Sequence, residues 1–301
     1  MKVSSHAEAM TLAGEHSIEA PAFRRSPFIK ISKSLLDFAQ ALLPKAVYQP
    51  IYEFSFRIYK GMLRQAYSRH LVYESIFGSR ARRMRAQLVH SVMPYSLVGS
   101  SGLEATYDAA VAVIEGAIAG DFVECGVAQG GCSALMAVVA NTDTRSRRRM
   151  WLFDSFQGLP DPTEDDFAAT ERSTGEHVRP LPRGSCLGTK EQVDNLLFSK
   201  FGLSRESIFL VEGWFQDRLP VYKDRIGPIA VLRIDGDWYD STLCCLHNLY
   251  DQVSLGGYII VDDYGSCFGC KKAVHEFLDS RSIKAELLPD GRGGVVFSKP
   301  R

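Results

Sequence analysis

The sequence predicts an α/β protein with a Rossmann-like, doubly wound fold, in which helices cover both faces of an open, mostly parallel sheet. From residue 103 onward, short apolar runs alternate with longer stretches of helical composition through five predicted parallel strands. The last two runs, 283–288 and 294–298, flank Pro-Asp-Gly-Arg and predict an antiparallel hairpin. Three hundred and one residues suffice for one such domain with an extension.

The extension is N-terminal. Residues 1–25 are polar, and we expect them to be disordered. Residues 26–95 predict a basic helical arm or cap, and residues 96–301 form the predicted α/β domain. Aromatic and aliphatic stripes predict three helices in the arm, with breaks at Pro44, Pro50 and Gly78; these helices cover residues 34–43, 47–68 and 72–92.

Charge is unevenly distributed, although the 35 basic and 35 acidic residues balance overall. Residues 21–95 carry +10 (13 minus 3), and residues 96–301 carry −8 (21 minus 29). This asymmetry and the apolar stripe in AVYQPIYEFSFRIY favour an arm packed in a homodimer or higher oligomer, or over the binding site. Contact between the arm and an anionic membrane surface stays open as the less favoured alternative. No recognition motif for nucleic acid accompanies the basic residues, so nucleic acid is not an expected partner.

The first candidate binding segment is GDFVECGVAQGGCSALMAVVA. Residues 122–125 predict a strand, residues 133–140 a helix, and the glycine-rich turn between them starts at Gly126 and ends at Gly131. A turn of this kind lets a ligand approach the backbone closely. It is not the GxGxxG dinucleotide motif, because residue 128 is alanine.

Two acidic positions define what this turn would bind. Glu124, just before the turn, would repel a pyrophosphate but suits a cationic or hydroxyl-bearing ligand. The next strand ends in Asp154 and Ser155, where an acidic residue commonly binds ribose hydroxyls. The combination predicts an adenosine site without a diphosphate, which fits S-adenosylmethionine (SAM).

Four aspartates at the ends of two later strands predict a metal site. Asp235 and Asp237 follow IAVLRI, and Asp262 and Asp263 follow GGYIIV. If these strands are neighbours, their carboxylates lie close together, repel one another and favour a bound cation. Oxygen ligands indicate magnesium or calcium rather than zinc. Alternatively, some of these aspartates cap the helices that follow.

Six segments together make the chain resemble the macrocin O-methyltransferase (TylF/MycF) family of SAM- and Mg²⁺-dependent sugar O-methyltransferases. The resemblance extends from Val98 to Ser298 and rests on these runs: ECGVAQGGCS, LFDSFQGLP, VEGWFQDRLP, IAVLRIDGDWYDST, LYDQVSLGGYIIVDDYG and KKAVHEFL. The first run departs from the family pattern, EtGVWRGG, because Ala128 and Gln129 replace its Trp-Arg pair.

The resemblance implies the seven-stranded, class I SAM-dependent methyltransferase form of the fold. It also implies roles for individual residues. Asp235, Asp262 and Asp263 match the metal ligands, with Asp235 also beside the cofactor, and Asp237 matches a proposed general base. The matches to the cofactor site are Val98, Gly99, Glu124, Gly126, Gly131, Asp154 and Ser155.

The implied reaction is methylation of a sugar hydroxyl in a glycosylated small molecule of natural product biosynthesis. A catechol or other aromatic diol stays open as the acceptor, as does a binding protein that keeps the fold without the catalysis. The loop 157–186 is rich in proline, glycine and acidic residues, and we interpret it as a lid over the acceptor site.

The seven cysteines form no disulfide-framework pattern, and no secretory signal opens the chain, so a cytoplasmic location is expected. No apolar run reaches the roughly 20 residues that span a bilayer.

Overall fold

A computed structural model of the chain describes residues 45–167 and 180–300. The predicted disordered N-terminus, the predicted helix 34–43 and the middle of the predicted lid lie outside the described residues.

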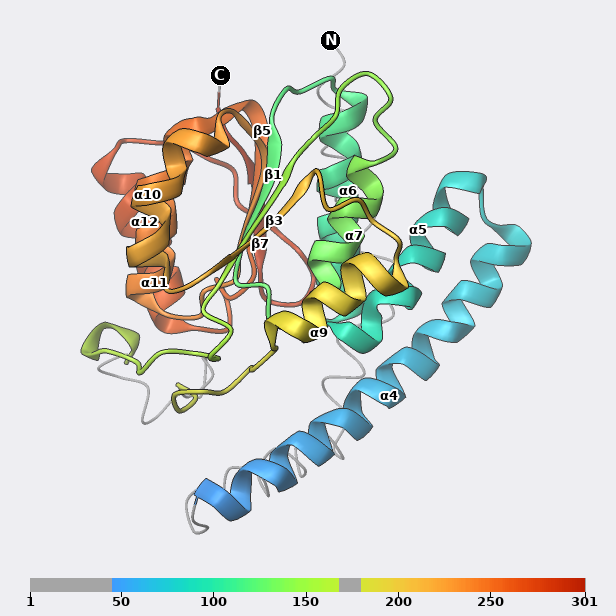
Figure 1. Ribbon diagram of the computed structural model, residues 1–301, viewed down its shortest axis with the longest axis horizontal. Helices are drawn as coiled ribbons and strands as arrows, with labels where there is room; N and C mark the ends of the chain where they lie inside the picture. Colours follow the sequence, from blue (N-terminus) through green and yellow to red (C-terminus); the bar gives the residue numbers. More distant parts are fainter. Residues whose placement is uncertain (1–44, 168–179, 301) are drawn as a thin grey trace.

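The centre of the structure is a seven-stranded sheet with the order β3-β2-β1-β4-β5-β7-β6 (Figure 1). Strands β1 to β5 are parallel, and β7 joins β5 in the antiparallel direction, as does β6 to β7. This confirms the predicted fold class. The strand bounds are β1 Asp121–Cys125, β2 Met150–Asp154, β3 Ile208–Glu212, β4 Ile229–Ile234, β5 Val253–Val261, β6 Leu288–Pro289 and β7 Val295–Ser298.

Helices cover both faces of the sheet (Figure 1). One layer contains α5 (Arg80–Val92), α6 (Ser100–Glu115) and α7 (Gly131–Ala140), together with α9 (Lys190–Asp194) and the π-helical segment η3 (Asn195–Lys200). The opposite layer contains α10 (Phe215–Ile226), α11 (Tyr239–Leu249) and α12 (Phe268–Ser280). Short 3₁₀ turns are η1 (Met93–Tyr95), η2 (Glu164–Asp166) and η4 (Tyr250–Gln252).

Two apolar cores, one on each face of the sheet, hold these layers together. Every residue of β1 and β4 is buried, as expected for central strands of a sheet covered on both sides. Their carboxyl ends are therefore fixed by the core. These ends carry the candidate site residues.

The helical arm differs from its prediction. The structure has one helix, α4 (Lys45–Phe77), where the sequence predicted an end near residue 68 and a break at Pro50. Pro50 lies in the second turn of α4, where it removes one intrahelical hydrogen bond without interrupting the helix. Gly78 does end the helix, and Ser79 then caps α5 by accepting a hydrogen bond from Arg82 N.

Among the helices that the structure describes, none combines the length and the apolar character that crossing a membrane requires.

Candidate active site

The glycine turn after β1 lies against the end of β4. Gly126 has φ 92°, and a Cβ added to it would meet the carbonyl oxygen of Asp235 at 1.9 Å. The Asp235 N–H donates to the Cys125 carbonyl at 2.8 Å, which joins the two strand ends. Only glycine fits here, because both the backbone conformation and the space exclude a side chain. The predicted cofactor turn and the predicted metal ligand Asp235 are thus in direct backbone contact.

Asp154 at the end of β2 holds this turn in place. Its Oδ2 accepts hydrogen bonds from the N–H groups of Val127 (2.7 Å) and Ala128 (2.9 Å). Its Oδ1 accepts one from Phe156 N at 2.6 Å. The neighbouring Ser155 hydroxyl donates to the Gly158 carbonyl at 3.1 Å. Both residues line the same cavity as the glycine turn, as predicted, and Asp154 in addition shapes the turn itself.

Glu124 is buried beneath the turn rather than exposed to solvent. The Ser133 hydroxyl donates to its Oε2, and the guanidinium of Arg233 lies 3.5 Å from its Oε1. Burial raises the pKa of Glu124 to about 8, although the nearby Arg233 opposes this shift. The side chain still contributes to the cavity lining.

The predicted metal aspartates converge. One carboxylate oxygen each of Asp235, Asp262 and Asp263 can be chosen so that all three lie within 4.8 Å of one another. Because β4 and β5 are adjacent, their carboxyl ends meet. Strand β5 ends at Val261, so the backbone has left the strand before the two aspartates and both can face the same side.

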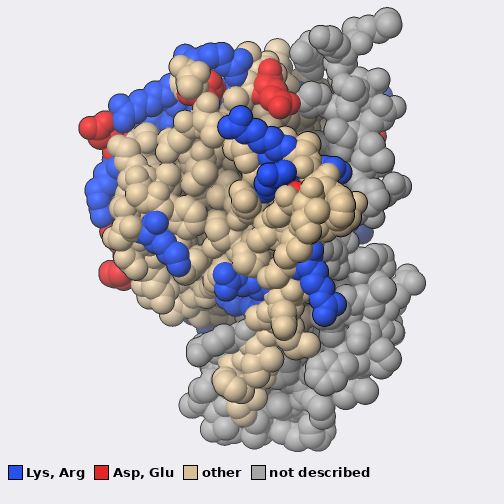
Figure 2. Space-filling view, turned by 90° about the vertical axis from the view of Figure 1, so that its right-hand side faces the viewer, with Lys and Arg blue, Asp and Glu red and all other residues tan. Residues whose placement is uncertain are grey.

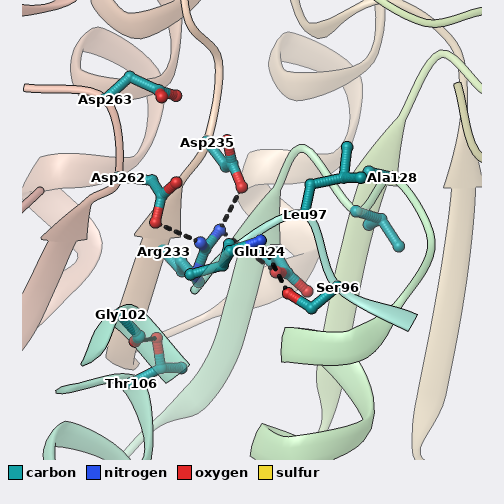
Figure 3. Close-up of polar contacts among 12 residues, drawn as sticks. Ser96, Leu97, Gly102, Thr106, Glu124, Ala128, Arg233, Asp235, Asp262 and Asp263 are labelled. Carbon is teal, nitrogen blue, oxygen red and sulfur yellow. Dashed lines mark hydrogen bonds and ion pairs between the residues drawn. The ribbon is translucent and has the colours of Figure 1, made fainter. Parts of the chain in front are cut away.

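Arg233 lies at the centre of this cluster (Figure 3). It is the penultimate residue of the otherwise apolar strand β4 and is fully buried. Its guanidinium bridges Asp235 and Asp262, with a distance of 2.8 Å to each carboxylate. A second cation, Arg292, comes from the loop after β6 and approaches Asp262 Oδ2 at 2.7 Å.

The cluster remains short of positive charge. With every carboxylate ionised, the four aspartates exceed the two guanidiniums by two negative charges, before Glu124 beside Arg233 is counted. Burial raises the pKa of Asp263 well above its usual range, and repulsion by the other aspartates adds to the shift. The same causes raise the pKa of Asp235, and they raise that of Asp237 to about 8. These shifts indicate a site that favours an additional cation.

The donor set fits a hard divalent ion. Asp263 Oδ2 is buried without a hydrogen-bond partner in the described part of the chain, so it has a lone pair available. A second grouping, Asp237, Asp263 and Cys267, includes a thiol, which Mg²⁺ does not favour. The all-oxygen group of Asp235, Asp262 and Asp263 is therefore the better candidate for magnesium.

A cavity of about 570 Å³ connects these groups. Of the predicted cofactor residues, Val98, Glu124, Gly126, Gly131, Asp154, Ser155 and Asp235 line it. Gly99 does not; it precedes the first turn of α6. All four aspartates line the cavity as well, and Asp237 has φ 53°, an unusual conformation for a residue other than glycine.

Part of the predicted lid also borders the cavity. Residues of 158–166 and Cys186 contribute to the lining. Asp166 fixes this part of the lid, because its Oδ1 accepts from Tyr239 N at the start of α11 (2.7 Å) and its Oδ2 from Thr163 N (2.8 Å). Gly269 of α12 packs so closely that an added Cβ would lie 1.9 Å from Asp166 Oδ1.

Several residues of the site were not predicted from the sequence: Ser133, Asp166, Trp214, Phe215, Arg233 and Arg292. Only Arg233 had a signal, since a charge within a buried apolar strand requires partners.

The family profile described as Macrocin-O-methyltransferase (TylF) matches residues 35–299. Demethyldecarbamoylnovobiocin O-methyltransferase of Streptomyces niveus is 39% identical over 69% of this chain and 76% of its own. Mycinamicin III 3''-O-methyltransferase of Micromonospora griseorubida is 30% identical, and the match covers 76% of this chain and 87% of the relative's length.

Among solved structures, the O-methyltransferase NovP is 38% identical to this chain and superposes with a TM-score of 0.60. The match covers 69% of this chain and 83% of the NovP chain. Calicheamicin methyltransferase CalS11 (19% identity, 79% and 91% coverage, TM-score 0.55) shares the fold. The chain belongs to the macrocin O-methyltransferase family and is an O-methyltransferase with the class I SAM-dependent fold.

Proposed function

We propose that the protein methylates a sugar hydroxyl of a glycosylated small molecule, with SAM as the methyl donor and Mg²⁺ at the three aspartates. The observation that carries this proposal is the convergence of Asp235, Asp262 and Asp263 on the cavity that the glycine turn also lines. A methyl donor and a hydroxyl-binding ion would then meet in one enclosed space.

The residues around the turn fit SAM. Gly126 packs directly against the Asp235 carbonyl and Gly131 against Tyr95 and Ser96, and Asp154 holds the turn by accepting from two of its N–H groups. We assign Asp154 and Ser155 to the ribose end of the cofactor. Val98 and Gly99 belong to the methionine end, with Glu124 and Asp235 between the two ends. Gly99 would act through its backbone at the start of α6.

The two ligands would supply the reactive groups, and the residues of the chain would position them. When bound, SAM supplies an electrophilic methyl group and Mg²⁺ lowers the pKa of a coordinated hydroxyl. Asp235, Asp262 and Asp263 would hold the ion, and Arg233 orients two of them. Asp237 lines the same cavity, so its carboxylate is positioned to accept the acceptor's proton.

The acceptor class rests on the relatives. Their names specify antibiotic glycosides: a novobiocin precursor, mycinamicin III and, for a 35% identical enzyme of Streptomyces olivaceus, a rhamnosyl tetracenomycin. An aromatic diol offers the same vicinal oxygens to an ion, and Trp214 and Phe215 line the cavity, so catechols are the second candidate class.

Transfer of a labelled methyl group from SAM to glycosides and catechols, with Mg²⁺ or with EDTA, tests the proposal. We expect product from glycosides, no turnover in EDTA and recovery on adding Mg²⁺. Full turnover in EDTA would rule out the metal role, and product from catechols alone would replace the acceptor class. Calorimetry with SAM and NAD checks the cofactor separately; binding of NAD but not SAM would refute it.

A further inference from the structure

Helix α4 has apolar side chains on two opposite faces. Leu63, Tyr67 and Leu71 recur every four residues and pack against the core shared with α5 and α6. Tyr67 is almost fully buried, and its hydroxyl donates to Glu104 Oε1 of α6 at 2.7 Å. This inner face accounts for the attachment of α4 to the domain.

The outer face is apolar but exposed to solvent. Among the α4 side chains that the structure describes, eight large apolar ones have exposed fractions between 42% and 67%: Ile51, Phe54, Ile58, Met62, Val72, Tyr73, Ile76 and Phe77. The first four recur at three- and four-residue steps, and the last four form two pairs spaced four residues apart, 72 with 76 and 73 with 77. Apart from a gap at Gln65 and Arg69, they form a single stripe. At 1.5 Å per residue, the stripe is about 39 Å long. A helix that is apolar on both faces is normally buried on both.

We propose that the outer stripe of α4 is the interface with a second copy of this chain, formed by the two α4 helices packing in antiparallel orientation. The area is sufficient: eight side chains that each bury roughly 100 Å² give roughly 800 Å² per copy, which is the size of a standard stable interface. The three- and four-residue spacing is that of helix pairs that pack side by side.

Charge selects the orientation. In a parallel two-fold pair, each residue lies opposite the same residue of the partner helix. In an antiparallel pair, it lies opposite the residue that is equally far from the axis on the other side. A parallel pair would place the exposed Arg69 next to the partner's Arg69. An antiparallel pair centred near Gln65 separates these two arginines by about 12 Å along the helix axis. It also aligns the helix dipoles favourably.

A bilayer is the competing partner. Basic side chains spread over the side of the molecule where α4 ends and α5 begins, whereas acidic ones lie mostly at its upper and left margins (Figure 2). Arg69, however, lies within the stripe itself, where membrane insertion would press its charge toward the acyl chains. The narrow stripe therefore fits a protein helix better.

Analytical ultracentrifugation of the full-length protein tests the interface. We expect wild type to have twice the mass of one chain. Ile58→Glu/Ile76→Glu should raise the dissociation constant by at least about thirtyfold. Both positions are exposed in a single copy, so circular dichroism should show an unchanged fold. Val221→Glu/Leu255→Glu is the matched control, because these side chains are equally exposed (63% and 62%) but lie on α10 and β5.

The dependence on salt concentration distinguishes a second copy of the chain from a membrane as the partner of the stripe. Raising NaCl screens the repulsion between the basic arms, so it should preserve or strengthen the dimer, whereas it weakens binding to anionic vesicles. A monomeric wild type, or a dimer that survives the glutamate substitutions, would refute the proposal. Monomeric wild type that binds phosphatidylserine vesicles and loses this binding in Ile58→Glu/Ile76→Glu would assign the stripe to membranes instead. None of these measurements depends on methyl transfer.

Discussion

Arg233 is the residue on which the geometry of the acidic centre depends. Replacing it with leucine leaves the partly buried Asp235 without its guanidinium partner and leaves the buried Asp262 with Arg292 alone. Breaking a buried ion pair from one side costs about 3–5 kcal/mol, so Arg233→Leu should lower the free energy of unfolding by about that amount. Urea denaturation in the absence of divalent ions measures the loss.

Arg233→Lys is the control for charge. A lysine keeps the positive charge but cannot bridge two carboxylates with a planar fork, so its loss should be intermediate. An Arg233→Leu variant as stable as wild type would show that the two carboxylates find other partners.

Gly126 is the position where a single methyl group should disturb the site. Gly126→Ala places a side chain at a positive φ and against the Asp235 carbonyl, so the turn or Asp235 must move. We expect a lower melting temperature and at least about tenfold weaker SAM binding, because the displaced backbone lines the cavity. Gly61→Ala is the control: nothing lies within 4 Å of its added Cβ on α4, and it should stabilise the protein by about 0.5–1 kcal/mol. Equal effects of the two substitutions would contradict this interpretation of the turn.

Replacing Asp237 should affect turnover, whereas replacing Asp263 should affect Mg²⁺ binding. Asp237→Asn should lower kcat by about 10²–10⁴-fold with SAM and Mg²⁺ affinities near those of wild type, as expected for a general base. Asp263→Asn removes a proposed ligand and should instead weaken Mg²⁺ binding, which calorimetry measures directly. Turnover retained in Asp237→Asn would assign the proton to another group.

At the scale of elements, Asp166 attaches the described part of the lid to α11 and α12. Asp166→Ala should release residues 157–167, because it removes the acceptors of Tyr239 N and Thr163 N. We expect faster hydrogen exchange in this segment and a higher KM for the acceptor, with SAM affinity unchanged. The neighbouring Asp165 is half exposed and, within the described part of the chain, forms an ion pair with Lys272 alone, so Asp165→Ala should change little. Unchanged exchange in Asp166→Ala would mean that other contacts hold the lid.

The elements also show which features local sequence determines. The parallel strands were predictable because apolar, β-branched runs end in glycine or aspartate, and their order placed Asp235 beside Asp262. The extent of α4 was not, because its inner face is stabilised by α5 and α6 rather than by local capping. The site residues that were missed, such as Arg292 and Asp166, reach the cavity only through long-range contacts.

At the scale of the whole molecule, the predicted boundary at residue 96 separates parts that pack together. Ala86, Val89 and Val92 of α5 belong to the core beneath α6, and Arg85 pairs with Glu104 and Asp108. A fragment of residues 96–301 would expose this core and remove Arg85 from both carboxylates. We expect it to aggregate or to bind a hydrophobic dye, whereas a fragment of residues 79–301 keeps these contacts and should melt cooperatively. Cooperative melting of the shorter fragment would show that α5 is dispensable.

The backbone contact between the glycine turn and Asp235 has a thermodynamic consequence. A ligand that rigidifies the turn also restricts the end of β4, and an ion that fixes Asp235 restricts the turn in return. The two binding equilibria are then linked, and linkage is reciprocal: magnesium must change the affinity for SAM by the same factor by which SAM changes the affinity for magnesium. Binding of either ligand would thus change the affinity for the other before the acceptor binds. Four titrations that close the thermodynamic cycle, each ligand with and without the other, would give the size of this cooperativity.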